Sequence, residues 1–252
     1  MPQAYSNAFA PIYNQKWPQF ANYVAPYLAH FYHTCAKDKA NRRVLDLCCG
    51  TGQVAQYFLQ YNYQVTGIDL SYPMLAEAVH NTLPFVQAGQ ARFIQADAAN
   101  FALHADFGLV LSTFDALNHL PNAQALRDCF ARVAAVTSGY FIFDLNTRVG
   151  LNKWDATFVI EESEDLTLLH RGSYDREAGV AWSIVTGFVR QENGLYQRFE
   201  ERVFNLVLDM RSVRAWLLET GFTKVYFARI ENLEEEVAEP ELESRVWFVC
   251  ER

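Results

Sequence analysis

The chain has 252 residues, of which 51% are hydrophobic, and a formal net charge of −8 at pH 7. This length allows one large or two small domains, and the hydrophobic content allows a sizeable core. The acidic balance argues against a nucleic-acid binder, which needs a basic face. Residues 231–244 hold seven Glu and no Lys or Arg. This run nearly accounts for the net charge and indicates a solvated acidic loop rather than a docking site for a basic partner.

No targeting or membrane segment is expected from the sequence. The first ten residues lack a cationic and an apolar region, and no run of about 18 apolar residues occurs. The five cysteines are odd in number and sit in a long chain, which does not favour a disulfide scaffold. We therefore expect a reduced, cytoplasmic protein without a membrane partner.

Helical spacing of apolar residues over 12–36 predicts a helical cap within residues 1–40, broken into short helices by Pro18 and Pro26. Strands and helices then alternate over residues 41–146. Strands are expected at 43–47, 63–70, 91–97, 106–113 and 139–146, and helices at 52–60, 71–81 and 122–137. The strands are mostly continuous apolar runs, which is typical of a parallel sheet covered on both faces. This predicts an α/β fold with a doubly wound, mostly parallel sheet of Rossmann-like type.

The pattern changes after Leu151. Long β-rich segments with turn signals, including Asn193-Gly194, predict an antiparallel meander over about 156–208. A helix at 209–221 and strands at 222–230 and 245–251 then complete a seven-stranded sheet. We expect residues 1–150 and 209–252 to form the core domain, and residues 151–208 to form an inserted subdomain on the substrate side.

The segment "VLDLCCGTGQVAQYF" from Val44 to Phe58 joins a strand to a helix through a glycine turn. Residues 50–55 formally match a dinucleotide-binding fingerprint, and no Gly-Lys-Ser/Thr follows that would make a phosphate loop. Adjacent Cys48 and Cys49 have no CxxC or His pair nearby, so they are expected to be buried apolar side chains and not metal ligands.

Three acids at successive strand ends distinguish the possible ligands. Asp69 can accept the hydroxyls of a ribose in either a nicotinamide or an adenosyl cofactor. Asp46 precedes the glycine turn, where an anion is unfavourable beside a pyrophosphate but favourable beside an ammonium group. Asp97 in "FIQADA" can accept an exocyclic amino group. Together they suit a zwitterionic nucleoside better than a bisphosphate.

With these motifs the chain resembles the class I S-adenosylmethionine-dependent methyltransferases. The ordered motifs are "VLDLCCGTG", "VTGIDLS", "FIQADA", "STFDALNHL" and "GYFIFDLNT", and the resemblance covers residues 41–150. It implies S-adenosyl-L-methionine as cofactor and S-adenosyl-L-homocysteine as product. At the methionine end of the cofactor, the implied contacts are Cys48, Gly50 and Gly52, with Asp46 at the amino group and Ser112 and Thr113 beside the sulfonium. Asp69 is implied at the ribose, Leu70 and Met74 on the adenine ring, and Asp97 with the Ala98 N–H at the adenine amino group. Tyr13 is implied as a residue that closes the pocket.

A general base is needed only if the acceptor arrives protonated. Asp115 and His119 are weak candidates. Asp115 equally fits a helix cap, and His119 fits a hydrogen-bonded structural histidine better than a base. Residues after the fourth and fifth strands, and aromatics of the meander, can border a substrate pocket. These residues are Asn118, Asn146, Arg148, Trp154, Trp182, Phe188 and Tyr196.

The function predicted is methyl transfer to a small-molecule acceptor by a monomer or homodimer. No nucleic-acid substrate is expected, because a basic groove is lacking. Two alternatives stay open at this stage. One is an NAD-dependent oxidoreductase, and the other is a non-catalytic module that binds the cofactor for regulation. A closed pocket beyond Ser112, without room for an acceptor, would favour the regulatory module.

Overall fold

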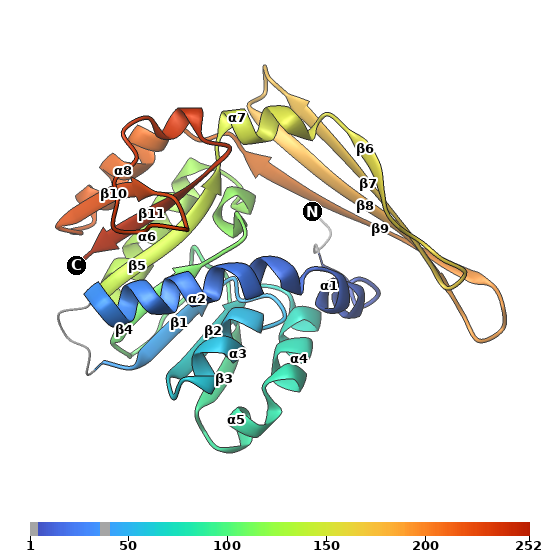
Figure 1. Cartoon of the computed structure of the whole chain (residues 1–252), viewed down its shortest axis with the longest axis horizontal. Coiled ribbons are helices and arrows are strands. Elements are labelled where there is room, and N and C mark those ends of the chain that lie inside the picture. Colours follow the sequence, from blue (N-terminus) through green and yellow to red (C-terminus); the bar gives the residue numbers. More distant parts are fainter. Residues whose placement is uncertain (1–4, 36–40) are drawn as a thin grey trace.

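The computed structural model describes residues 5–35 and 41–252, which build two sheets (Figure 1). The first sheet has the strand order β10-β11-β5-β4-β1-β2-β3. Its strands are β1 (Arg43–Leu47), β2 (Gln64–Asp69), β3 (Ala91–Gln95), β4 (Phe107–Ser112), β5 (Thr137–Asn146), β10 (Lys224–Ala228) and β11 (Arg245–Glu251). Strand β11 is antiparallel to β5 and β10, whereas the other neighbours are parallel. The predicted doubly wound, mostly parallel sheet of seven strands is therefore confirmed.

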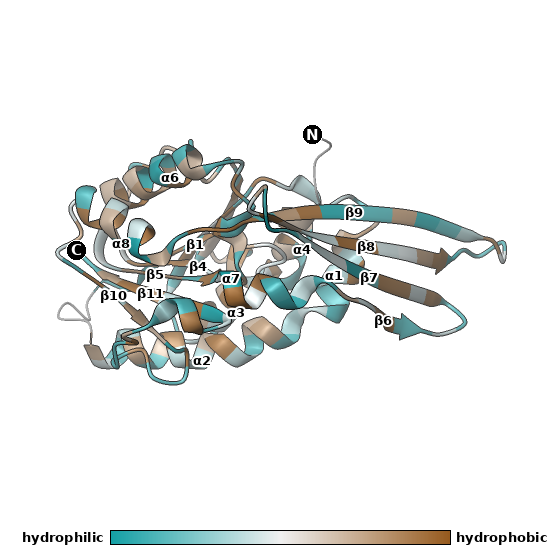
Figure 2. Ribbon diagram, turned by 90° about the horizontal axis from the view of Figure 1, so that it is seen from above, coloured by the Kyte–Doolittle hydropathy of each residue, from teal (hydrophilic) through white to brown (hydrophobic). Residues whose placement is uncertain are grey.

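Helices cover both faces of this sheet, as Figure 2 shows with α6 and α8 on one side and α2 and α3 on the other. The helices are α1 (Ala10–Lys16), α2 (Pro18–Cys35), α3 (Gln53–Gln60), α4 (Tyr72–Asn81), α5 (Leu83–Gln87), α6 (Ala123–Val136), α7 (Arg148–Leu151) and α8 (Met210–Glu219), with 3-10 turns η1 (Ala116–His119), η2 (Asn152–Trp154) and η3 (Pro240–Leu242). Two separate apolar clusters fill the two layers. Burial on both faces explains the continuous apolar strands of the sequence.

Helix α2 differs from the prediction, because it passes through Pro26 without ending. The proline removes one backbone donor, and its ring crowds the preceding turn. Pro26 and Asn22 are exposed, so water can satisfy the carbonyl of Asn22 that loses its partner. Buried Ala25 and Leu28, beside the proline, hold the helix against the sheet. Tertiary packing thus overrides the local break that Pro26 predicts.

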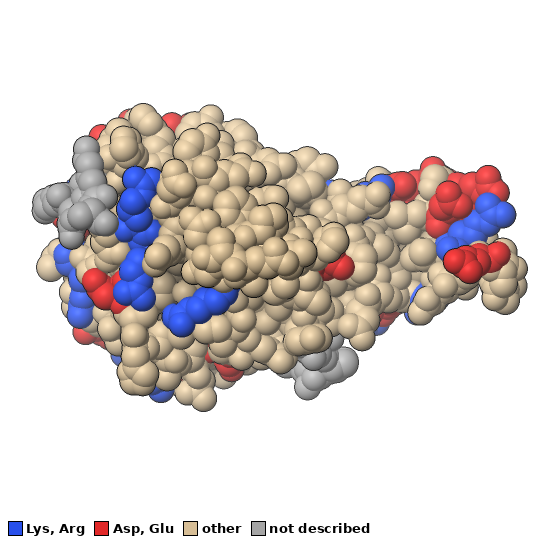
Figure 3. Space-filling view, turned by 90° about the horizontal axis from the view of Figure 1, so that it is seen from below, with Lys and Arg blue, Asp and Glu red and all other residues tan. Residues whose placement is uncertain are grey.

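The predicted antiparallel meander is confirmed as a second sheet with the order β6-β7-β8-β9. Its strands are β6 (Thr157–Glu162), β7 (Leu166–Asp175), β8 (Val180–Arg190) and β9 (Tyr196–Leu206). It extends away from the first sheet (Figure 1). Gly194 takes a positive φ of 79° in the β8–β9 turn, as the Asn-Gly signal predicts. Figure 3 shows charged side chains gathered at the far end of this sheet, where Arg190 pairs with Glu164 and Asp165.

Helix α1 connects the two sheets. Phe9, at the start of α1, packs with Leu168, Val185 and Phe199 of the second sheet. The same helix contacts α4 through Asn14, which donates to Glu77 over 3.0 Å. The inserted sheet therefore lies over the carboxyl ends of the parallel strands, where open α/β sheets bind their ligands.

The acidic loop over 231–244 is tied to helix α8 at several points. Glu241 accepts from the backbone N–H of Met210 over 2.8 Å, which satisfies a free donor at the start of α8. Glu236 pairs with Arg214 over 3.2 Å, and the loop residue Pro240 is buried. These carboxylates stabilise the loop against the core, which the charge pattern alone did not indicate.

Candidate functional site

The glycine turn after β1 places backbone N–H groups at the strand ends. Gly50 donates to Oδ2 of Asp69 over 2.9 Å. Gly50 and Gly52 have positive φ values of 53° and 78°, which side chains rarely adopt. A Cβ added to Gly52 would lie 2.9 Å from the Cβ of Ala78. Glycine at position 52 thus allows α3 to begin close to α4.

Asp69 ends β2 and organises this turn. Its Oδ2 accepts from Gly50, and its Oδ1 accepts from the N–H of Ser71 over 2.8 Å. Burial raises the pKa of Asp69, while the N–H groups of Ser71 and Gly50 oppose that rise. Each carboxylate oxygen retains acceptor capacity after these bonds. The side chain can therefore hold a ligand hydroxyl while it fixes the turn.

A cavity of about 450 Å³ opens beside this turn, and we call it the first cavity. The predicted site residues that line it are Tyr13, Cys48, Gly50, Asp69, Leu70, Met74, Asp97, Ala98, Thr113 and His119. They come from α1, the ends of the four strands β1 to β4, α4 and η1. The fold thus brings together most residues that the resemblance implied, although their contacts with a cofactor stay predictions.

Three predicted cofactor contacts lie behind the cavity wall. Gly52 and Ser112 are not among the lining residues, and Ser112 is 1% exposed. Asp46 is also 1% exposed, and its Oδ2 has no hydrogen-bond partner in the described part of the chain. Burial, followed by the charge of Asp69, raises the pKa of Asp46 to about 7. A buried carboxylate with an open acceptor position suits a nearby cation.

Sequence reasoning missed several residues that line the first cavity. They are Tyr5, Ser71, Ala96, Phe114, Ala116, Leu120, Arg202, Val203 and Phe204. Arg202, Val203 and Phe204 belong to β9 of the second sheet. Trp182 of β8, predicted only as a possible pocket wall, also lines this cavity and lies opposite Phe204 with ring centroids 5.7 Å apart. No local sequence motif predicts these positions, because the strands of the second sheet lie beside the cavity only in the folded structure.

The segment before α1 closes one side of the cavity. The N–H groups of Tyr5 and Ser6 donate to Glu201 of β9 over 2.9 and 3.1 Å. Ser71, beside Asp69, donates its hydroxyl to the carbonyl of Tyr5 over 2.8 Å. Tyr5 therefore connects the first sheet, through Ser71, with strand β9 of the second sheet, through Glu201.

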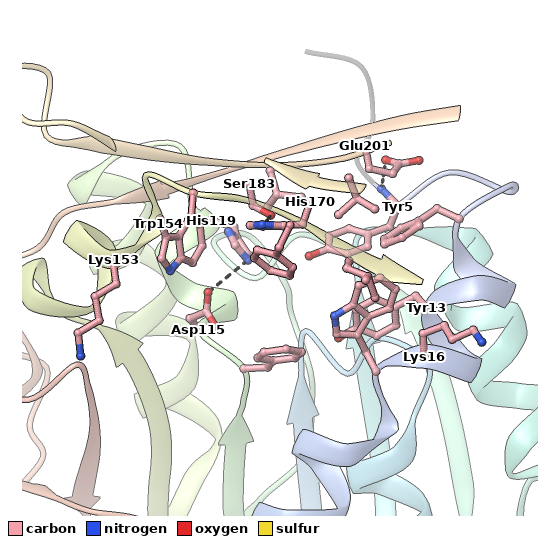
Figure 4. Close-up of a pocket in the computed structure, with 18 of the residues that line it drawn as sticks. Tyr5, Tyr13, Lys16, Asp115, His119, Lys153, Trp154, His170, Ser183 and Glu201 are labelled. Atoms are coloured by element: carbon pink, nitrogen blue, oxygen red, sulfur yellow. Dashed lines mark hydrogen bonds and ion pairs between the residues drawn. The ribbon is translucent and has the colours of Figure 1, made fainter. Parts of the chain in front are cut away.

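A second cavity of about 470 Å³ adjoins the first beneath the inserted sheet (Figure 4). The residues that line both cavities are Tyr5, Tyr13, Phe114, His119 and Val203. Asp115 and Trp154 line the second cavity only. Phe188 and Tyr196, predicted as possible pocket walls, line neither cavity. The two cavities therefore share part of their walls.

The turn after β4 is held by a buried charge network. Phe114 and Asp115 have positive φ values of 66° and 49°. Their N–H groups donate to the buried carboxylate of Asp144 over 2.7 and 2.9 Å. Arg245 of β11 contacts Asp144 and pairs with Asp115 over 2.7 Å. Asp115 precedes η1 but makes no side-chain cap; instead it is half of this ion pair.

His119 is oriented by the second sheet. Its Nδ1 lies 2.7 Å from the carbonyl oxygen of Phe204. A carbonyl can only accept, so Nδ1 carries the proton, and Nε2 of the neutral ring keeps its lone pair. This Nε2 lies 4.0 Å from Oδ2 of Asp115 (Figure 4). The geometry is that of an available proton acceptor bordering both cavities.

The other candidates near this turn have different positions. Asn118 is fully buried and donates its amide to the carbonyls of Leu206 and Asn146 over 2.9 and 3.3 Å. It thereby ties the end of β9 to the end of β5. Arg148 is exposed, and neither Asn146 nor Arg148 lines the two cavities.

Comparison with known proteins shows a similarity to methyltransferases. The family "Methyltransferase domain" matches residues 44–138, which contain the glycine turn, Asp69, Asp97 and His119. A Geobacillus sp. (strain WCH70) protein, "Putative methyltransferase GWCH70_2453", is 27% identical over 223 residues, covering 84% of this chain and 85% of that protein. Residues 44–138 are thus similar to the methyltransferase domain family, in agreement with the predicted resemblance to the class I S-adenosylmethionine-dependent methyltransferases.

Solved structures share the fold of this chain over almost its whole length. An S-adenosylmethionine-dependent methyltransferase from Clostridium acetobutylicum superposes with a TM-score of 0.78 at 19% identity, covering 97% of this chain and 98% of that one. The amino pentose methyltransferase CalS10 from Micromonospora echinaspora gives a TM-score of 0.71 at 19% identity, covering 100% and 99%. Each alignment therefore includes the inserted sheet as well as the core.

The match to a methyltransferase domain favours S-adenosylmethionine over the nicotinamide cofactor. The residues of the first cavity fit that molecule. Asp69 offers carboxylate oxygens for hydroxyls, and Oδ2 of the buried Asp46 has no hydrogen-bond partner among the described residues. No group of three or more His, Cys, Asp or Glu side chains in the described ranges is arranged to hold a metal. None of the helices described is long and apolar enough to cross a membrane.

The buried Asp46 leads to a prediction about stability and pH. Its folded pKa of about 7 lies above its ordinary value of 3.8, so the folded state prefers the protonated form. The stability that this preference gives is present below the ordinary pKa and is lost as pH rises through 7. We expect Asp46→Asn, which keeps the shape without the charge, to stabilise the cofactor-free protein at pH 8.

The gain in the free energy of unfolding from Asp46→Asn should be smaller at pH 5 than at pH 8. The linkage between pKa and stability gives a difference of up to roughly 3 kcal/mol. Urea denaturation of both proteins at pH 5 and pH 8 measures the difference. Because Asp69 and Asp144 also titrate with raised pKa values, only the difference between variant and wild type isolates Asp46. An equal stabilisation at both pH values would contradict the assignment.

Proposed function

We propose that the chain transfers the methyl group of S-adenosylmethionine to an amino or hydroxyl group of a small molecule bound in the second cavity. The observation that carries this proposal is that five residues line both cavities, including Tyr13 and His119. A cofactor in the first cavity and an acceptor in the second would therefore meet across one shared wall. Residues 1–150 and 209–252 would serve the cofactor, and the insertion 151–208 would cover the acceptor.

The residues of the first cavity have distinct proposed roles. Asp69 would hold the ribose hydroxyls, and Asp97 with the N–H of Ala98 would hold the adenine amino group. Leu70 and Met74 would pack on the adenine ring. The proposed roles at the methionine end are as follows: the backbone of Cys48, Gly50 and Gly52 along the chain, Asp46 through water at the ammonium group, Ser112 and Thr113 near the sulfur, and Tyr13 as the closing side chain.

When bound, S-adenosylmethionine supplies a methyl group on positively charged sulfur, which an in-line nucleophile displaces. The protein would align the acceptor for this displacement. The new bond would join the methyl carbon to the acceptor nitrogen or oxygen, and the carbon–sulfur bond would break. Nε2 of His119 would receive the proton that the acceptor loses, and Asp115 would stabilise the resulting imidazolium from 4.0 Å.

Several observations support a small acceptor. The second cavity measures about 470 Å³, which is within the range of small-molecule sites. The amino pentose methyltransferase, whose fold matches the full chain, acts on a sugar by its name. The cavity also argues against the purely regulatory alternative, which a closed pocket beyond Ser112 would have favoured.

The test combines binding and transfer. Calorimetry should show tight binding of S-adenosylhomocysteine and none of NADH. Methyl-deuterated S-adenosylmethionine is then incubated with the protein and a cell extract, and the small-molecule, protein and nucleic-acid fractions are analysed by mass spectrometry. We expect the label in the small-molecule fraction alone. Label in protein or nucleic acid, or preferential binding of NADH, would refute the proposal.

A further inference from the structure

Most charged side chains around the second cavity already have partners. Lys16 forms an ion pair with Glu161 of β6. Lys153 donates to the hydroxyl of Ser244 over 2.7 Å. Glu201 holds the N–H groups of the segment before α1. These groups are therefore engaged within the protein and are poorly placed to bind a charged part of an acceptor.

His170 of β7 is different, because it retains an open hydrogen-bonding position. Its Nε2 lies 2.9 Å from the hydroxyl of Ser183 on the neighbouring strand β8. Its Nδ1 is buried and has no partner among the residues the structure describes. Figure 4 shows His170 and Ser183 together at the roof of the second cavity, which both side chains line. Buried polar atoms in folded proteins normally have a partner, so the unsatisfied nitrogen and the Ser183 hydroxyl beside it mark a polar position in the wall of this cavity.

The environment of His170 selects an uncharged ligand group. Burial lowers the pKa of His170, so the ring is neutral at neutral pH and offers one N–H and one lone pair. The ring of Phe158 packs on it with centroids 4.6 Å apart. Because the Ser183 hydroxyl can donate or accept, Nδ1 can take either role. A hydroxyl group, which also has both roles, is the best match.

We infer that the acceptor is a compact ring molecule with two polar groups, of which one is methylated beside His119 and a second, uncharged hydroxyl is held by the His170–Ser183 pair. This inference rests on the proposed function. His119 belongs to η1 on the core, whereas His170 belongs to the inserted sheet. The two histidines thus contact the acceptor from two different parts of the fold. His170 acts as a positioning residue that contributes to specificity.

The aromatic lining supports a ring between these two anchors. The aromatic side chains of the second cavity are Tyr5, Phe9, Tyr13, Trp17, Phe114, Trp154 and Phe158. Flat faces of this kind pack on aromatic or sugar rings. The polar ends of the ring then need specific partners, since an unpaired buried polar group is costly.

The experiment measures the deuterated-methyl transfer to the extract with wild type, His170→Phe and Ser183→Ala. Arg171→Ala is the matched control, because Arg171 is the next residue on β7, is exposed and does not line the cavity. At low extract concentration, His170→Phe should label its product about tenfold more slowly, the effect of one lost hydrogen bond. At high extract concentration the rate should recover, because KM rises and kcat does not fall. Ser183→Ala should show the same effect more weakly.

Binding of S-adenosylhomocysteine should be unchanged in every variant, which controls for folding. The labelled product should contain an unmethylated hydroxyl besides the methylated group, and its analogue without that hydroxyl should react equally with wild type and His170→Phe. Transfer that is insensitive to His170, or a product with a single polar group, overturns this inference alone. No transfer by the wild type, despite bound S-adenosylhomocysteine, overturns the proposed function and this inference with it.

Discussion

Replacing Asp69 with Asn is expected to lower the affinity for S-adenosylhomocysteine about 100-fold, since hydrogen bonds to a charged group contribute about 1.5–3 kcal/mol each. The carboxylate accepts from Gly50 and Ser71 and faces the first cavity. An amide of the same shape offers one oxygen in place of two and carries no charge. It would therefore lose a bond to the proposed ribose and place an N–H₂ group beside a backbone donor. Isothermal calorimetry measures the change.

Because Asp69 also fixes the glycine turn, the affinity alone does not separate binding from structure. The separating measurement uses an S-adenosylhomocysteine analogue with a 2′-deoxyribose. Wild type should bind this analogue more weakly than the parent compound, whereas Asp69→Asn should bind the two almost equally. Asp128→Asn, an exposed change on α6 where the carboxylate contacts only Gln124 in the described structure, should behave as wild type. A variant that still discriminates fully would show that Asp69 does not contact the hydroxyl.

The cofactor side of the cleft could be predicted because its signals are local. The glycine turn, the acids at Asp69 and Asp97 and the cap at Ser71 each follow a strand within a few residues. Ser71 does accept from the N–H of Met74 over 3.4 Å, as a helix cap should. Since parallel strands end at one edge of a sheet, knowing the strands is enough to gather these residues.

Asp46 shows the limit of such local reasoning. Its position before the glycine turn indicated a place in the binding site, yet the side chain lies behind the cavity wall. Successive residues of a strand alternate between faces, and the sequence does not say at which residue β1 ends. The raised pKa of Asp46, which follows from this burial, was equally invisible in the sequence.

The acceptor side depends on contacts between distant segments. Arg245 reaches Asp115 across 130 positions and Asp144 across 101. The sequence placed these residues in separate strands and loops, without a signal that would pair them. The meander was predicted, but periodicity cannot tell against which part of the core an inserted sheet packs. His170, Glu201 and Phe204 therefore entered the site only through the tertiary structure.

The largest effect on catalysis is expected for His119→Gln, which should lower kcat by about 10²–10⁴-fold, the usual contribution of a general base. The carbonyl of Phe204 fixes the proton on Nδ1, so Nε2 is the acceptor in the neutral ring. Glutamine keeps an N–H group for that carbonyl but has no titratable nitrogen. Single-turnover transfer from deuterated S-adenosylmethionine to the extract measures the rate, and calorimetry with S-adenosylhomocysteine should show unchanged binding.

The pH profile distinguishes a base at His119 from a structural histidine. In wild type, kcat/KM should depend on pH through the removal of the acceptor's proton, and this dependence should change in His119→Gln. A histidine that only ties η1 to β9 would change stability and leave the shape of the profile intact. His30→Gln, an exposed change on α2, serves as the control for removal of a histidine. If the variant retains both rate and profile, the acceptor must reach the cleft already deprotonated, and the mechanism then requires alignment of the acceptor but no base from the protein.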